Sequence, residues 1–219
     1  MKAVHSLILS LVICAAILGA GCTNPQATTP PPAGVQAVPT IDPATLALTP
    51  AEVPKNFTLA SQTVKNPADV GALARDLGWQ GGYTVRYIGP AGPNGVPAEI
   101  IQSIAYYPAA AMPDVIAMSD KQDRADTDLT YTNLSPSTLG ANSRGFFGKA
   151  PAGLYIKPTN VNPLVTGSEH HDVSAELKTD VAEIIFSKGN VFEVIRMSGP
   201  GADTQAVTAL AEKAYAKIP

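Results

Sequence analysis

Hydrophobic and polar residues are distributed in two different ways along the chain, and the change falls near residue 48. Residues 7–21 are uncharged and mostly apolar, whereas residues 23–49 are rich in proline, alanine and threonine and carry one charged side chain, Asp42. Beyond residue 48, short apolar runs alternate with turns rich in glycine and proline. This order predicts a leader, a disordered linker and one globular domain. The predicted bounds are 1–21 for the leader, 22–47 for the linker and 48–219 for the domain.

Period-two alternation predicts the strands of the domain. The clearest hairpin turns at Ser187–Asn190, where Gly189 can take the positive φ of a tight turn. Ile184 and Ile185 point to opposite faces of their strand, so this hairpin is expected at the centre of the sheet, with cover on both faces. The predicted strands are 57–63, 81–88, 98–107, 143–148, 153–157, 181–186 and 191–197.

Apolar positions at helical spacing predict three helices. In the first, Asn66 is the N-cap, Pro67 suits the first turn and Gly78 ends the helix. In the last, Asp203 caps a helix whose apolar stripe should lie across the sheet. The predicted helices are 66–77, 109–119 and 203–218, and the polar stretch 120–138 is predicted to be irregular.

The order of these elements predicts the fold class. Consecutive strands joined by turns favour antiparallel pairing, and the helices are interspersed among them. No internal repeat and no heptad pattern is present. We therefore expect an α+β domain with a single antiparallel sheet and helices packed on it.

The apolar leader predicts where the chain is located. Its run of about 15 residues is shorter than the roughly 20 that a membrane-spanning helix needs, and a small-residue cleavage region follows, which is typical of a secretory signal. The segment resembles the lipoprotein signals of bacteria and some archaea, which implies that Cys22 receives a lipid after cleavage. Leu18 lies four residues before Cys22, and Gly19 holds the usual leucine position. The expected location is the extracytoplasmic face of the cell membrane. The alternative is ordinary secretion with a free Cys22.

Cysteine content and charge limit the chemistry of the mature chain. Cys14 would leave with the leader, so the domain has no disulfide and no thiol nucleophile. The whole chain has a formal net charge of −3 and contains no cluster of basic residues. That balance argues against a nucleic-acid partner and against docking on anionic lipid through a polybasic patch.

Parts of the domain resemble small secreted α+β lipoproteins of unknown function, and its element order is loosely similar to the PsbP-like fold. The resemblance implies an extracytoplasmic α+β domain and implies no site residue. The segments that carry it are Leu48–Pro54, Gly78–Tyr83, Ser143–Phe147 and the hairpin Glu183–Pro200 with the helix that follows.

Aromatic residues give one candidate binding site. Trp79, Tyr83 and Tyr87 lie close together in sequence, and aromatic faces with polar edges suit a ligand groove. The simpler alternative is that strand alternation places some of these rings in the core and others on the outer face.

Two polar clusters are candidate metal sites. His170, His171 and Asp172 combine imidazole and carboxylate ligands. An acid-rich stretch, 114–128, offers oxygen ligands, but Tyr131 stands where a calcium loop needs glycine. For both clusters, the alternative is a solvated loop. No motif for an organic cofactor is present, so none is expected.

These observations lead to one functional hypothesis and two alternatives. We expect a membrane-anchored surface domain, not an enzyme, that binds a ligand or a partner protein. The first alternative is a metal-dependent surface enzyme that uses His170 and His171. The second is a purely structural envelope protein.

Overall fold

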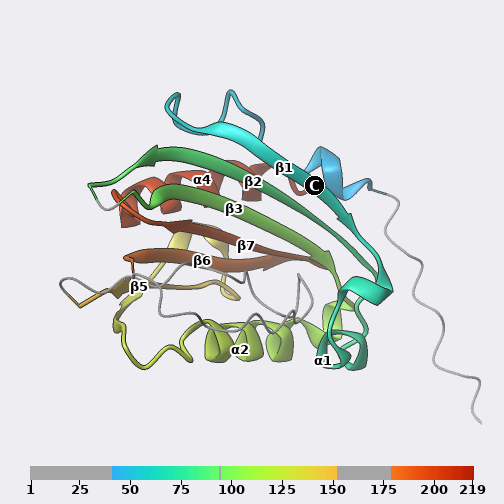
Figure 1. Cartoon of the computed structure of the whole chain (residues 1–219). Helices are drawn as coiled ribbons and strands as arrows, with labels where there is room; N and C mark the ends of the chain where they lie inside the picture. The colour runs from blue at the N-terminus through green and yellow to red at the C-terminus, as the bar shows by residue number, and fades with distance from the viewer. Residues whose placement is uncertain (1–40, 94, 152–178) are drawn as a thin grey trace, which may run out of the picture. The chain divides into compact units, whose positions relative to one another are not determined.

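The computed structural model describes residues 41–93, 95–151 and 179–219, and these residues contain an antiparallel sheet with helices on both faces (Figure 1). The strands are β1 (Thr58–Lys65), β2 (Gly81–Ala91), β3 (Pro97–Tyr106), β4 (Thr130–Leu134), β5 (Arg144–Lys149), β6 (Val181–Lys188) and β7 (Val191–Ser198). The α-helices are α1 (Ala72–Asp76), α2 (Met112–Asp123) and α4 (Thr204–Lys217). Short 3-10 helices are η1 (Pro43–Thr45), η2 (Pro67–Asp69), η3 (Ala109–Ala111) and η4 (Ser137–Leu139).

All seven described strands belong to one sheet with the order β1-β2-β3-β7-β6-β5-β4, and every neighbouring pair is antiparallel. The predicted α+β class is therefore confirmed. The β6–β7 hairpin lies inside the sheet, between β3 and β5, with Gly189 in its turn at φ 62°. Its central position was predicted from large apolar side chains on both faces.

The sheet lies between α4 and α2 (Figure 1), and an apolar core lies on each of its faces. On one face, α4 packs on β6 and β7 and buries Val207, Leu210 and Ala214 against Ile184. On the other face, α2 packs on β5 and β6, and the residues it helps to bury include Ile185. Because successive strand residues alternate between faces, the single sequence Ile184-Ile185 contributes to both cores. None of the described helices is long and apolar enough to cross a membrane.

The packed fold begins before the predicted start at residue 48. Leu46, Ala47 and Leu48 are all buried in the core on the α4 side of the sheet. Here we call residues 46–48 the N-terminal strap. The Leu48 N–H donates to Gln102 Oε1 at 2.6 Å, and Lys217 Nζ of α4 donates to the Ala47 carbonyl at 2.6 Å. The strap is therefore held by both the sheet and α4.

Under the strap lies a carboxyl group that is fully buried. Gln102 Nε2 donates to Glu193 Oε2 at 2.7 Å and lies 3.3 Å from the Leu46 carbonyl oxygen. Burial raises the pKa of Glu193 from its ordinary value of 4.5 to about 8, against the opposing effects of Gln102 and Lys217. A buried carboxyl without a strong cation partner is more stable when protonated.

The predicted helix over 66–77 is interrupted in the structure. After η2, Val70 is extended, with φ −114° and ψ 146°, and Gly71 is the N-cap of α1. Glycine disfavours the helical conformation, so Gly71 favours a break in the helix at this point. Arg75 donates to the Val70 carbonyl, which has left the helical hydrogen-bond pattern. Val70 and Ala74 nevertheless bury the apolar stripe that the sequence indicated.

Two further predictions about secondary structure were wrong. The stretch 120–138 was expected to be irregular, but α2 continues to Asp123 and β4 follows as an edge strand. The first strand was predicted over residues 57–63, but β1 begins at Thr58 and ends at Lys65. Phe57 is buried before the strand begins, whereas Leu59 is 43% exposed and a bulge follows it. Both errors involve β1 or β4, which have a neighbour on one side only among the described strands, so alternation is weakly enforced there.

We predict that Glu193→Gln reduces the dependence of stability on pH. Because the pKa of Glu193 is raised in the folded state, the protonated form favours folding, and stability falls as pH rises from about 4.5 to about 8. One such group accounts for a slope of up to about 1.4 kcal/mol per pH unit. Urea unfolding between pH 4.5 and 8.5 should show this part of the slope lost in the variant. An unchanged slope would contradict the raised pKa.

Candidate functional site

A polar groove lies where the C-terminal end of α2 meets β4, η4 and the start of β5. It has a volume of about 580 Å³, and we call it the β4–β5 groove. A second hollow of about 450 Å³ shares residues 134–136 with it and extends to the first turns of α4. The polar residues that line the β4–β5 groove are Asp120, Arg124, Asn133, Ser135, Ser137, Ser143 and Arg144.

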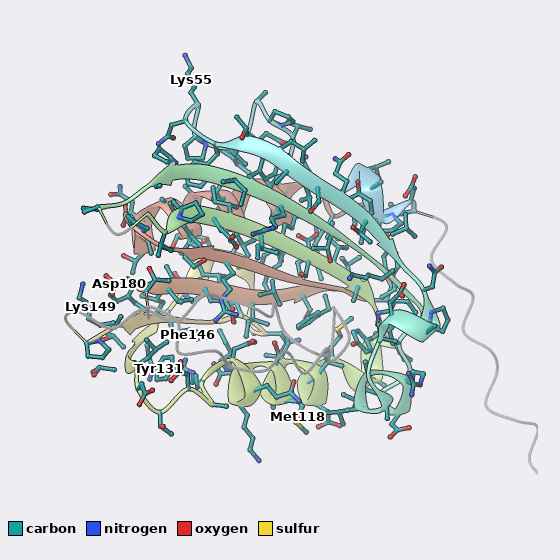
Figure 2. All side chains as sticks on the ribbon, in the orientation of Figure 1. Lys55, Met118, Tyr131, Phe146, Lys149 and Asp180 are labelled. Atoms are coloured by element: carbon teal, nitrogen blue, oxygen red, sulfur yellow. The ribbon has the colours of Figure 1, made fainter. Side chains whose placement is uncertain are left out.

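Arg124 forms one wall of this groove and is held from several sides. Its Nε donates to Asp120 Oδ1 at 2.7 Å, and its Nη2 donates to the Gly145 carbonyl at 3.2 Å. The guanidinium carbon lies 4.8 Å from the ring centroid of Phe146 and 5.8 Å from that of Tyr131. These two rings pack edge to face, with centroids 5.2 Å apart, beside the C-terminal end of α2 (Figure 2). Arg124 thus fastens α2 to β4 and β5.

The same guanidinium orients Asn133. Arg124 Nη1 donates to Asn133 Oδ1 at 2.8 Å, so the carbonyl end of the amide faces the arginine. An amide has one acceptor end and one donor end. The two N–H donors of Asn133 are therefore directed away from Arg124, in a residue that lines the groove.

Arg144 is the second cation of the groove, and its surroundings differ from those of Arg124. It is the exposed first residue of β5 and donates to the carbonyl of its neighbour Ser143 at 3.0 Å. Among the residues that the structure describes, it forms no ion pair. Asp120 is already paired with Arg124, so the positive charge of Arg144 is uncompensated within the groove.

Serine hydroxyls complete the lining. Ser143 Oγ lies 2.8 Å from the Gly140 carbonyl oxygen and 3.1 Å from that of Pro136, and this contact closes the turn between η4 and β5. Ser135 and Ser137 are exposed, and within the described ranges their hydroxyls make no hydrogen bond. They are available to a bound molecule.

A pair of buried carboxyls lies on the inner side of α2, one residue from the groove. Ser119 Oγ donates to Asp123 Oδ2 at 3.0 Å, and Asp123 lies beside the fully buried Glu183 of β6. Burial raises the pKa of both carboxyls, and the charge of Asp123 raises the pKa of Glu183 further. Arg196 Nε, 3.6 Å from Glu183 Oε2, opposes that shift. Asp123, the last residue of α2, and Glu183 of β6 thus form a pair of buried carboxyls between the helix and the sheet.

The structure revises the interpretation of the acid-rich stretch 114–128. Asp123 was grouped with solvated acids, but it is buried against the sheet because α2 extends to that residue. Asp126 Oδ1 accepts the N–H of Asp128 at 2.9 Å, as expected of a polar turn. In the three described segments, no three acids, histidines or cysteines are grouped so that they could hold a metal ion.

The three aromatic residues proposed from sequence do not share a groove. Tyr83 and Tyr87 belong to the core on the α4 side and are 6% and 0% exposed. Trp79 belongs to the core on the opposite face of the sheet and is 9% exposed. The Tyr87 hydroxyl donates to the Leu48 carbonyl of the strap at 2.6 Å. Alternation places Tyr83 and Tyr87 on one face of β2, whereas Trp79 precedes that strand and packs on the other face of the sheet. All three rings are buried, so none lies on an outer face, as the alternative considered above expected for some of them.

The other sequence-based site residues lie outside the described residues. These are Cys22, His170, His171 and Asp172, together with the strand predicted over 153–157. The groove residues were not identified from sequence, because serines, Asn133 and two arginines spread over residues 120–145 form no recognisable motif. The only signal was the position of Arg124 and Arg144 at the two ends of an acidic and polar stretch.

Comparisons with known proteins give a distant structural similarity. No family model matches the chain, and no curated protein matches it. The structure is similar to the crystal structure of the extracellular domain of PknH from Mycobacterium tuberculosis, with 10% sequence identity and a TM-score of 0.45. The match covers 80% of this chain and 94% of that domain. A likeness this distant does not establish a family or a function.

We predict that Arg124→Ala destabilises the domain by about 1–3 kcal/mol, because Asp120, Asn133 and the Gly145 carbonyl lose a charged donor. The matched control is Lys121→Ala, which removes an exposed cation from the same turn of α2. Urea unfolding can be followed by the fluorescence of Trp79, the single tryptophan of the chain. Equal stability of the two variants would show that Arg124 does not fasten α2.

Proposed function

We propose that this chain is an extracytoplasmic domain, anchored to the membrane by a lipid on Cys22, and that it binds a small ligand in the β4–β5 groove. The proposal for location is supported by the apolar leader of residues 7–21 and the small residues before Cys22. Two lipid chains anchor a protein stably to a membrane, whereas a single chain gives only marginal binding.

One observation carries the proposal of ligand binding. The wall of the groove is fixed by the interactions of Arg124, whereas Arg144, Ser135 and Ser137 in the same lining offer polar groups that the described part of the chain leaves unpaired. Ligand sites combine a rigid frame with a few unsatisfied polar groups. A frame that is ordered before binding lowers the entropic cost of association.

The groove supports binding better than it supports catalysis. Its acid, Asp120, is engaged by Arg124 at 2.7 Å, and its hydroxyl groups have no base beside them among the described residues. A hydroxyl nucleophile requires an adjacent base for activation. Asp123 of α2 and Glu183 of β6 are buried between the helix and the sheet and do not line the groove. The metal-dependent enzyme considered above depends on His170 and His171 and stays a prediction.

The strap supports the role of a tethered domain. The Ile41 carbonyl accepts a hydrogen bond from the Tyr106 hydroxyl at 2.9 Å, and residues 46–48 are buried. The segment that would connect to the lipid therefore enters the fold through the core. A mechanical force on residues 41–48 is transmitted directly to the sheet, which suits a domain attached to a membrane through its N-terminal side.

Anchorage can be tested with the Cys22→Ser variant. We expect the wild-type chain, expressed in a host that processes lipoproteins, to partition into the detergent phase of Triton X-114 and to show an acylated Cys22 by mass spectrometry. The variant should partition into the aqueous phase, because its acceptor thiol is missing. An unmodified Cys22, or a leader still attached, would contradict the proposal for location without affecting the proposal for binding.

Binding can be tested by blocking the groove. A panel of small polar molecules is screened against the full mature chain by thermal shift, since a ligand that binds the folded state raises its melting temperature. We expect Ser135→Tyr to abolish the shift and Ser61→Tyr, an exposed serine on β1, to preserve it. If the shift survives in Ser135→Tyr, binding occurs elsewhere, and the proposal for the groove is wrong.

A further inference from the structure

We propose that the ligand of the β4–β5 groove is a small oxyanion, a carboxylate or a phosphate group, bound through Arg144. This inference rests on the proposed function and assigns the ligand's chemical class. The charge and the hydrogen-bond donors in the lining of the groove both favour such a ligand.

The balance of charge in the groove is positive. The acid Asp120 and the cation Arg124 neutralise each other through their 2.7 Å contact. Arg144 remains without an ion pair among the described residues and uses one N–H on the carbonyl of Ser143. The acid Glu212 lines the neighbouring hollow and not the β4–β5 groove, and it accepts a hydrogen bond from Thr138 Oγ1 at 2.8 Å. An anion would meet a guanidinium whose planar set of donors matches two oxygens of a carboxylate or phosphate.

The balance of hydrogen-bond groups also favours an acceptor-rich ligand. The amide of Asn133 turns its acceptor to Arg124 at 2.8 Å and keeps two N–H donors for the groove. The hydroxyls of Ser135 and Ser137 can both donate. With Arg144, these side chains supply mainly donors, and an ionised carboxylate or phosphate supplies only acceptors.

Two other classes of ligand fit less well. A neutral sugar is usually bound by stacking on an exposed aromatic face, but the guanidinium of Arg124 lies 4.8 Å from the ring centroid of Phe146 and 5.8 Å from that of Tyr131. A cation needs acidic ligands, and Asp120, the acid of the lining, is already engaged by Arg124. The groove therefore selects negative charge.

The two arginines have different roles in this proposal. Arg124 is a positioning residue, because its hydrogen bonds orient Asn133 and fix the wall. Arg144 is the residue that contacts the anion. A substitution of Arg144 should weaken binding and leave the fold intact, since its side chain is exposed and makes one described hydrogen bond.

The test is isothermal titration calorimetry of the full mature chain with inorganic phosphate, acetate and glucose as separate probes. We expect Arg144→Gln to weaken binding of the preferred anion about ten- to hundredfold, the value of a charge-assisted hydrogen-bonded pair. The control is Lys55→Gln, which removes the same charge from an exposed side chain that projects away from Tyr131 and Phe146 (Figure 2). Tighter binding of phosphate identifies a phosphate ligand, and tighter binding of acetate identifies a carboxylate.

Several outcomes would overturn the inference. Equal weakening by Arg144→Gln and Lys55→Gln would show a general effect of charge and no site. Binding of glucose without binding of either anion would refute the oxyanion, while a loss of glucose binding in Ser135→Tyr would keep the groove as a binding site. Absence of binding for both anions would refute the oxyanion, and the thermal-shift panel with Ser135→Tyr would then decide on the groove itself. Unfolding followed by Trp79 fluorescence shows that each variant is folded.

Discussion

The structure depends on the way two buried carboxyls are accommodated on the central β6–β7 hairpin. Glu183 and Glu193 lie on opposite faces of the sheet, and both are fully buried. A polar group in such a place is stable only when it is hydrogen-bonded or uncharged. On one face, Glu193 is bound by Gln102, which also holds the strap. On the other, Glu183 lies beside Asp123 of α2 and 3.6 Å from Arg196 Nε. Each carboxyl is therefore buried between the sheet and a different peripheral element.

The attachment of α2 leads directly to the groove. Asp123 faces the sheet, and the next residue, Arg124, reaches over Phe146 to the Gly145 carbonyl and to Asn133. The C-terminal end of α2 thus makes a buried contact through Asp123 and a surface contact through Arg124. The buried contact fixes the helix, and the surface contact fixes the wall of the groove and the orientation of its amide. Arg144 lies on the same lining without such a partner among the described residues, which is why we assign it to the ligand.

Much of the fold could be predicted from the sequence, because its central elements have strong periodicity. The β6–β7 hairpin and α4 were recognised from runs in which each apolar position has a partner in the core, as Ile184 and Val207 do. Edge elements gave a weaker signal. The polar strand β4 was missed because its exposed residues obey no alternation, and the first helix was drawn too long across Gly71.

The candidate site could not be predicted in the same way. Burial of Asp123 depends on the length of α2 and on Glu183, which lies 60 residues away in sequence, and neither is visible in local composition. The groove depends on residues from α2, β4, η4 and β5 that have no common motif. The aromatic cluster of Trp79, Tyr83 and Tyr87 was conspicuous in sequence, yet Tyr83 and Tyr87 of β2 lie in one core and Trp79, which precedes β2, lies in the other.

The most direct test of this account is the titration of the glutamate side chains by carboxyl carbon NMR in the folded chain. We expect the pKa of Glu193 to be about 8, because burial disfavours its charged form. We expect the pKa of Glu183 to lie well above its ordinary value of 4.5, because it is buried and lies beside the charge of Asp123. If both carboxyls titrate near 4.5, they are ionised and solvated at neutral pH. In that case they do not hold the strap and α2 in place.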